Sequence, residues 1–236
     1  MEQNTSKDAV VIHSGGMDSS LCLALAMREF GAENVVSLSF SYHQKHSPEL
    51  NQAAKICREW GVEHKVIKLD YMDQITSNAL ISHHIPIEHK PGEVPNTLVM
   101  GRNGLMARLG AIYAHHIGAH YIYMGVIEVE EANSGYRDCS RAYMDLKQQI
   151  LRIDLDDPTF EIRTPIVKMT KKETLELGKQ LGILDYLLNE TITCYEAIPR
   201  QGCQTCPACI LRNEGIRQYM IANPSYKPPY LVKLYS

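Results

Sequence analysis

The chain has 236 residues, 44% of them hydrophobic, and its 24 basic and 27 acidic side chains give a net charge of −3. This length suffices for one large α/β domain with its own core and a small appendage. At this net charge we do not expect nucleic acid as a partner, because nucleic-acid binding usually needs a basic surface. There is neither a signal-peptide pattern at the start nor an apolar run of roughly 18 residues, so we expect a soluble cytoplasmic protein without membrane contact.

Hydrophobic periodicity predicts an alternation of strands and helices. The predicted strands are residues 9–12, 35–40, 66–69 and 121–125. The predicted helices are residues 19–31, 48–60, 105–113, 141–150, 171–181 and 210–221. This alternation predicts a doubly wound parallel sheet of the Rossmann type, with right-handed crossovers. Leu105, Leu109 and Ile112 are expected in its core.

A glycine-serine loop, Ser14-Gly15-Gly16-Met17-Asp18-Ser19-Ser20, joins the first strand to the first helix. Glycines let backbone N–H groups approach phosphate oxygens closely, and the first turn of a helix favours an anion. Asp18 is expected either to cap the helix or to bind a Mg²⁺ ion that bridges it to the phosphates. Without a Walker lysine, transfer of the γ-phosphoryl group is disfavoured, so we predict a pyrophosphate site for ATP. The predicted ATP site is Ile12, His13, Ser14, Gly15, Gly16, Met17, Asp18, Ser19, Ser20, Leu21 and Cys22.

Four of the seven cysteines crowd together near the end of the chain: Cys194, Cys203, Cys206 and Cys209. Four thiolates match a closed tetrahedral zinc site, and an iron–sulfur cluster is the alternative. We predict a structural Zn²⁺ without a catalytic role. It would stabilise a C-terminal appendage, residues 191–236, that packs on an α/β domain of residues 1–190. The other cysteines are expected to be packed thiols, with Cys139 as the one candidate for reactivity.

The glycine-serine loop resembles that of the ATP pyrophosphatase family, whose members transfer AMP to a substrate oxygen. Together with the cysteine spacing, it resembles the 7-cyano-7-deazaguanine synthase family of the queuosine precursor pathway. Further matches to that family are Tyr42-His43-Gln44-Lys45-His46, Glu49-Leu50, Gly101-Arg102-Asn103, Ser134-Gly135-Tyr136, Asp138-Cys139, Thr164-Pro165, Thr170-Lys171 and Cys209-Ile210-Leu211-Arg212. The similarity covers residues 10–212 and implies an adenine nucleotide alpha-hydrolase-like fold.

The resemblance implies an ATP-dependent carbon–nitrogen ligase that converts 7-carboxy-7-deazaguanine and free ammonia to the nitrile through adenylated intermediates. It implies ATP, Mg²⁺ and Zn²⁺ as cofactors and a homodimer as the assembly. The residues expected to act in catalysis are Asp18, Arg102 and Lys171. Those expected to bind the substrate are Lys45, His46, Arg102, Asn103, Gly135, Tyr136 and Asp138. The chemistry needs charge neutralisation and positioning rather than a covalent nucleophile.

Several of these residues have simpler alternative roles. Lys171 opens a predicted helix and can equally belong to a solvated face, and Lys45 and His46 can be ordinary surface residues. Arg102 and Asn103 begin a helix, so capping competes with substrate binding.

The chain also departs from the family pattern at Met100, Ala132-Asn133, Arg137 and Ser140. Arg141 is a candidate to replace the arginine that the family has at position 140. Most of these changes border the expected substrate loop, so a related enzyme that modifies a protein or nucleic acid is the alternative function. Further alternatives are a tRNA-thiolating enzyme, whose cysteines would carry no permanent metal, and a non-catalytic zinc module.

Overall fold

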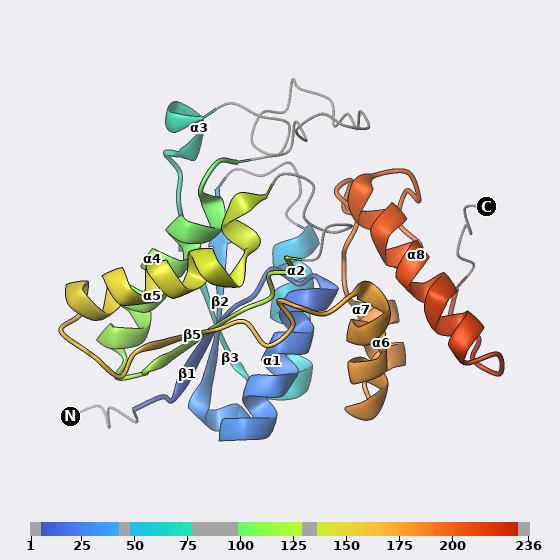
Figure 1. Cartoon of the computed structure of the whole chain (residues 1–236), viewed down its shortest axis with the longest axis horizontal. Helices are drawn as coiled ribbons and strands as arrows, with labels where there is room; N and C mark the ends of the chain where they lie inside the picture. Colours follow the sequence, from blue (N-terminus) through green and yellow to red (C-terminus); the bar gives the residue numbers. More distant parts are fainter. Residues whose placement is uncertain (1–5, 43–47, 77–98, 129–135, 231–236) are drawn as a thin grey trace.

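The structure is a computed structural model that describes residues 6–42, 48–76, 99–128 and 136–230. Within these ranges, no helix has both the length and the apolar character needed to cross a membrane. The described residues contain a central sheet with helices on both of its faces (Figure 1).

The sheet has five parallel strands in the order β3-β2-β1-β4-β5. The strands are β1 (Ala9–Ile12), β2 (Val35–Ser41), β3 (Glu63–Lys68), β4 (Tyr121–Met124) and β5 (Glu161–Arg163). This order confirms the predicted doubly wound sheet, in which ligands bind beyond the carboxyl ends of the strands. β1 lies at the centre, because Ile12 pairs with Leu38 on one side and with Met124 on the other. The loop that follows β1 therefore opens at the middle of the ligand-binding edge.

The helices pack as two layers. They are α1 (Met17–Phe30), α2 (Pro48–Trp60), α3 (Met72–Ile75), α4 (Arg102–His116), α5 (Arg141–Asp154), α6 (Lys171–Gln180), α7 (Leu184–Glu190) and α8 (Pro207–Ala222), with short 3-10 helices at η1 (Ala32–Asn34) and η2 (Arg137–Cys139). α4 and α5 cover one face, whereas α1, α6, α7 and α8 lie on the other side (Figure 1). Each face of the sheet has its own hydrophobic core. Because side chains alternate along a strand, Val10 belongs to the core under α4 and α5, and Val11 belongs to the core under α1.

α4 approaches the sheet through small residues, which makes the prediction for Ile112 wrong. Ile112 is 51% exposed, and Leu105 and Leu109 are only partly buried against the core. A Cβ atom on Gly110 would lie 2.5 Å from Cδ1 of Ile12, so a larger residue there would displace this side chain of β1. The buried face consists of Gly104, Met106, Ala107, Gly110, Ala111 and Ala114. A search for large apolar residues consequently selects the wrong side of this helix.

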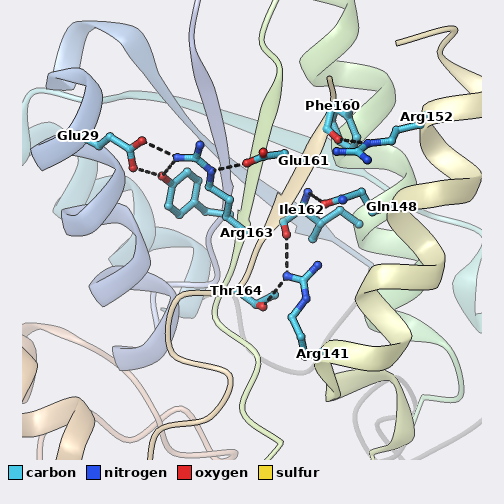
Figure 2. A network of polar contacts seen from close by, with 10 residues as sticks. Glu29, Arg141, Gln148, Arg152, Phe160, Glu161, Ile162, Arg163 and Thr164 are labelled. Atoms are coloured by element: carbon cyan, nitrogen blue, oxygen red, sulfur yellow. Dashed lines mark hydrogen bonds and ion pairs between the residues drawn. The ribbon is translucent and has the colours of Figure 1, made fainter. Parts of the chain in front are cut away.

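The short edge strand β5 is held by polar side chains of α5 (Figure 2). The Arg141 guanidinium donates to the carbonyl oxygen of Ile162 at 2.8 Å and to Oγ1 of Thr164 at 2.9 Å. Oε1 of Gln148 accepts from the backbone N–H of Ile162 at 2.7 Å. These bonds satisfy backbone groups that an edge strand would otherwise leave unpaired. Arg141 is therefore a structural brace for β5.

Candidate active site

The glycine-serine loop turns against the start of α2. Gly15 has a φ of +80°, and a Cβ atom there would lie 2.5 Å from the carbonyl oxygen of Glu49 and 3.0 Å from the backbone nitrogen of Ala53. Only glycine combines this backbone conformation with so close an approach. α1 then begins with Gly16 as its N-cap residue, in an extended conformation and without a side-chain cap. The free N–H groups of the first turn of α1 thus lie at the carboxyl end of β1, as an anion site requires.

We expect Gly15→Ala to destabilise the protein by about 1–3 kcal/mol and to weaken ATP binding, because the new methyl group would push α2 away from the loop. Chemical denaturation and ATP titration of the folded variant would measure the two effects. Gly61→Ala is the matched control. Gly61 has a φ of +68°, but no atom lies within 4 Å of its Cβ position. Equal effects of the two substitutions would show that backbone strain alone, rather than the contact with α2, explains the result.

The hydroxyl groups of the loop bond mainly to the loop itself. Ser19 Oγ donates to the carbonyl oxygen of Gly16 at 3.2 Å and lies 3.1 Å from Ser14 Oγ. Ser20 Oγ donates to the same carbonyl at 2.8 Å. The Ser20 side chain is fully buried, and its oxygen lies 3.0 Å from Nε2 of His13. These bonds fix the shape of the loop, and they turn Ser20 inward rather than toward a ligand.

Asp18 does not cap α1, contrary to one of the two roles expected for it, because Gly16 occupies that position. Its two carboxylate oxygens instead accept hydrogen bonds from Nζ of Lys171, at the start of α6. Lys171 is 8% exposed, so the alternative that it belongs to a solvated face is wrong. A Cβ atom on Gly215 would lie 2.5 Å from Cβ of Lys171, so α8 presses directly on this lysine. The fold thus brings a buried ammonium group to the glycine-serine loop.

Thr170 fixes the start of α6 through a capping box with Glu173. The Thr170 hydroxyl accepts from the backbone N–H of Glu173 at 3.2 Å, and the Glu173 carboxylate accepts from the backbone N–H of Thr170 at 2.7 Å. Such reciprocal bonds stabilise the first turn of a helix. They place Lys171 as the first residue of α6 and so aim its side chain at the loop.

Arg102 opens α4 in a partly buried, aromatic environment. Burial by itself would lower the pKa of its guanidinium, but the neighbouring phenol oxygens of Tyr42, Tyr136 and Tyr195 raise it, and Tyr42 also hydrogen-bonds to it. The pKa of Tyr195 is raised by burial and by its hydrogen bond with Tyr136. A positive fork among flat rings can hold a planar, anionic ligand.

Asn103 and Asp138 bind each other. The Asp138 carboxylate accepts from the backbone N–H of Asn103 at 2.8 Å and from its Nδ2 at 3.2 Å. Asp138 therefore binds the N-terminus of α4, where Gly101 provides no side-chain cap. Cys139 is partly buried, and burial raises the pKa of its thiol to about 12. This thiol is consequently not the reactive group suggested by its polar sequence context.

Glu49 is a further candidate whose role the sequence did not reveal. It lies in the first turn of α2. Burial raises the pKa of its carboxyl group to about 7; the charge of Arg102 opposes this increase, and Cys194 adds a smaller increase. The only sequence signal was its place in a family motif, because nothing local shows that residue 49 faces residue 102. A carboxyl group that titrates near neutrality can accept or donate a proton.

The described residues do not include all predicted substrate ligands. Lys45, His46 and Gly135 lie outside them. The structure brings Tyr136 and Arg102 together, and it places Asn103 and Asp138 directly beside them. Within the described ranges, the candidate substrate-binding residues thus lie at or next to the ends of β2, α2, α4 and η2.

The four clustered cysteines converge on one point before and at the start of α8. One ligand atom from each of Cys194, Cys203, Cys206 and Cys209 lies within 4.8 Å of the others. None of them forms a disulfide. Neighbouring sulfurs of a tetrahedral zinc site are about 3.8 Å apart, given Zn–S bonds of about 2.3 Å. The backbone N–H of Cys203 donates to Sγ of Cys194 at 3.3 Å, and that of Cys206 donates to Sγ of Cys203 at 3.2 Å. Such bonds stabilise thiolates, so the donor set fits a structural metal ion.

The cysteine cluster is connected to the glycine-serine loop through a short segment of chain. The backbone N–H of Ile192 donates to the carbonyl oxygen of Gly15 at 3.0 Å. Cys194 follows two residues later, and Tyr195 is next to Arg102. A metal ion that holds Cys194 would therefore also hold two sides of the candidate active site.

The chain matches known proteins over most of its length. Residues 8–220 match the family described as queuosine biosynthesis protein QueC. The 7-cyano-7-deazaguanine synthase of Bacillus subtilis (strain 168) is 39% identical over 213 residues, which are 90% of this chain and 95% of that protein.

Two solved structures are similar at lower levels. The NH3-dependent NAD synthetase from Campylobacter jejuni is 20% identical, with 78% of this chain and 67% of that chain covered and a TM-score of 0.49. The NMN synthetase from Francisella tularensis is 14% identical, with 96% and 91% covered and a TM-score of 0.49. The match over most of the length of this chain and of its curated relative is decisive: the chain belongs to the QueC family, the 7-cyano-7-deazaguanine synthases of queuosine biosynthesis that its motifs predicted.

Proposed function

We propose that this chain converts 7-carboxy-7-deazaguanine and ammonia to 7-cyano-7-deazaguanine at the expense of two ATP molecules. The observation that carries the proposal is the ion pair of Asp18 with Lys171 at the glycine-serine loop, together with Arg102 among Tyr42, Tyr136 and Tyr195. The family membership supports it independently.

The reaction is proposed to proceed through two adenylations. A carboxylate oxygen of the substrate attacks the α-phosphorus of ATP, and pyrophosphate leaves. Ammonia then attacks the acyl carbon, AMP leaves and a proton is lost, which gives the amide. The amide oxygen attacks a second ATP in the same way, and loss of AMP and protons leaves the nitrile. Each step converts a poor oxygen leaving group into AMP, so the enzyme must mainly position groups and stabilise charge.

Each part of the site has a role in this scheme. Backbone N–H groups of the loop and of α1 bind the pyrophosphate, and Lys171 neutralises the charge that develops on it. Asp18 holds Lys171 and offers carboxylate oxygens to Mg²⁺, which would reduce repulsion between the phosphates. Arg102 binds the substrate carboxylate, and Tyr136 and Tyr195 flank the planar ring system.

The cysteine site is proposed to hold Zn²⁺ in a purely structural role, because four thiolates leave no open position. In the same proposal, residues 191–236 are an appendage on the α/β domain of residues 1–190. Ile216 and Tyr219 of α8 share a core with α1 and α7, which supports an appendage that packs rather than folds alone. A cytoplasmic homodimer is proposed from the family, and light scattering coupled to size exclusion would test the dimer.

Incubation of the purified chain with ATP, Mg²⁺, ammonium and 7-carboxy-7-deazaguanine tests the function. We expect formation of the nitrile and release of two AMP molecules per nitrile. Mass spectrometry would measure both products. AMP formation without nitrile would indicate a different acceptor, and no AMP formation with this substrate would contradict the proposal.

Glu49→Gln is expected to lower nitrile formation by about 10²–10⁴-fold, the usual effect of losing a general base. Glu49 lies beside the arginine proposed to hold the substrate carboxylate, where attack by ammonia releases a proton. Substrate-dependent exchange of pyrophosphate into ATP should be largely retained, because that step precedes the attack. Glu59→Gln, on the same helix but bonded to Tyr186, is the control and should retain full activity. Equal loss of exchange and of nitrile formation would assign Glu49 to binding instead.

A further inference from the structure

A second cluster of metal-binding side chains lies beneath the pyrophosphate loop. It brings together His13 after β1, Ser37 of β2, Cys57 of α2 and His64 of β3. Ser37 Oγ lies 3.0 Å from Nδ1 of His13 and 3.0 Å from Nδ1 of His64. Cys57 Sγ lies 3.7 Å from each of the same two nitrogens. Two imidazoles and a thiol therefore face one point, with a hydroxyl at its side.

The hydrogen bonds are compatible with a proton on Nε2 of His13. Ser20 Oγ lies 2.8 Å from the carbonyl oxygen of Gly16 and 3.0 Å from Nε2 of His13, so a hydroxyl that donates to Gly16 can accept from Nε2. Burial, with a smaller effect of His64, lowers the pKa of His13 to about 3, and the ring is neutral at physiological pH. With the proton on Nε2, Nδ1 of His13 presents a lone pair to the cluster. In metal sites, a histidine that binds the ion through one ring nitrogen commonly donates the N–H of its second ring nitrogen to a fixed acceptor, which orients the ring.

His64 and Cys57 complete the donor set. Nε2 of His64 is buried and has no hydrogen-bond partner among the described residues. A metal ion at Nδ1 would place the ring proton on Nε2, so this histidine lacks the fixed acceptor that His13 has in Ser20. The expected separation of nitrogen and sulfur in a tetrahedral zinc site is about 3.6 Å, given bonds of about 2.0–2.1 Å and 2.3 Å. The observed 3.7 Å matches this value. His64 is half-buried on an edge strand, which gives an ion a route from the solvent.

We propose that His13, Cys57 and His64 form a second metal site, which binds a zinc-type divalent ion through one sulfur and two nitrogens, with Ser37 Oγ or water as the fourth ligand. Binding displaces the proton of the Cys57 thiol, which passes to the solvent, so the occupied site has a net charge of +1. Imidazole and thiolate donors suit Zn²⁺ and Co²⁺ and disfavour Mg²⁺.

The site would be coupled to the pyrophosphate loop. The chain of hydrogen bonds from His13 through Ser20 reaches the carbonyl oxygen of Gly16, the N-cap residue of α1. A metal ion at Nδ1 of His13 would strengthen the donation from its Nε2 and so stiffen the loop. The added positive charge beneath an anion site would also favour the phosphates of ATP.

Metal counting on the full chain tests the proposal without relying on activity. After loading with Zn²⁺ and removal of loosely bound ions, elemental analysis should give two zinc ions per chain for the wild type. Cys57→Ser and His64→Asn should each retain one, held by the four clustered cysteines. Cys22→Ser, which changes another buried thiol outside the cluster, should retain two. Co²⁺ loading adds a spectroscopic check, because loss of the second site should leave the absorption of a four-thiolate site unchanged.

One zinc ion in the wild type, or two in both Cys57→Ser and His64→Asn, would overturn the proposal. Thermal melting of each variant confirms that it is folded before its metal content is compared. His64→Asn is the milder change, because His64 is half-buried on the outer strand whereas Cys57 is 1% exposed. A difference between it and the wild type therefore decides the question even where Cys57→Ser fails to fold. Neither result depends on the deazaguanine reaction, so failure of the proposed function leaves this test intact.

Discussion

Lys171→Met is expected to lower AMP formation by at least about 10²–10³-fold, the effect of losing one preorganised group that stabilises transition-state charge. The ammonium group of Lys171 is buried, bonded to Asp18 and placed at the loop that is proposed to hold the pyrophosphate. Methionine has a similar length without the charge, so the packing against Gly215 should persist. Initial rates of AMP release at saturating substrate would measure the effect, and the KM for 7-carboxy-7-deazaguanine should change little.

Lys172→Met is the matched control, because it makes the same change one residue later. Lys172 is partly exposed and pairs with Glu176 within α6, and such pairs contribute little. Its activity should be that of the wild type. Equal losses in the two variants would contradict a specific role for Lys171 and would point to the stability of α6. Asp18→Asn is expected to lower the rate as well, because it leaves the buried lysine without its anionic partner.

Removal of metal from the cysteine cluster should abolish activity and loosen the chain around the active site. Binding energies of structural zinc are on the order of 10 kcal/mol and are largely folding energy. Without the ion, the segment before α8 loses its anchor, and with it the bond from Ile192 to Gly15 and the placement of Tyr195 beside Arg102. Hydrogen exchange should therefore rise both at residues 191–206 and in the loop that follows β1, although the two are far apart in sequence.

Cys206→Ser tests this expectation at the four-cysteine site alone, and a chelated wild-type sample re-supplied with Zn²⁺ is the control. Recovery of AMP formation on return of Zn²⁺, but not of Mg²⁺, is expected for the wild type. The variant should not recover. Faster exchange confined to residues 191–206, with the loop and the activity unchanged, would show that the appendage folds separately from the site.

Local patterns were sufficient for much of the fold. The β-branched run at Ala9–Ile12 and the glycines after it depend on contacts within a few residues, so they were readable directly. β5 and α7 were missed, because Glu161–Arg163 is short and polar and Leu184–Glu190 spans only seven residues. Neither segment is long enough to show a period. The position of Ile112 was wrong because α4 meets the sheet through glycine and alanine.

The same distinction between local patterns and long-range contacts applies to the candidate site. The sequence determined the glycine-serine loop and the cluster of four cysteines, because each is a local arrangement whose chemistry depends on residue type and spacing. Only the tertiary structure decided that Asp18 binds Lys171, 153 positions away, and that the segment before Cys194 bonds to Gly15. It also turned Ser20 inward and placed Glu49 beside Arg102. Such pairs form because α6, α8 and α2 pack where their buried faces and glycines allow, and no short stretch of sequence encodes that outcome.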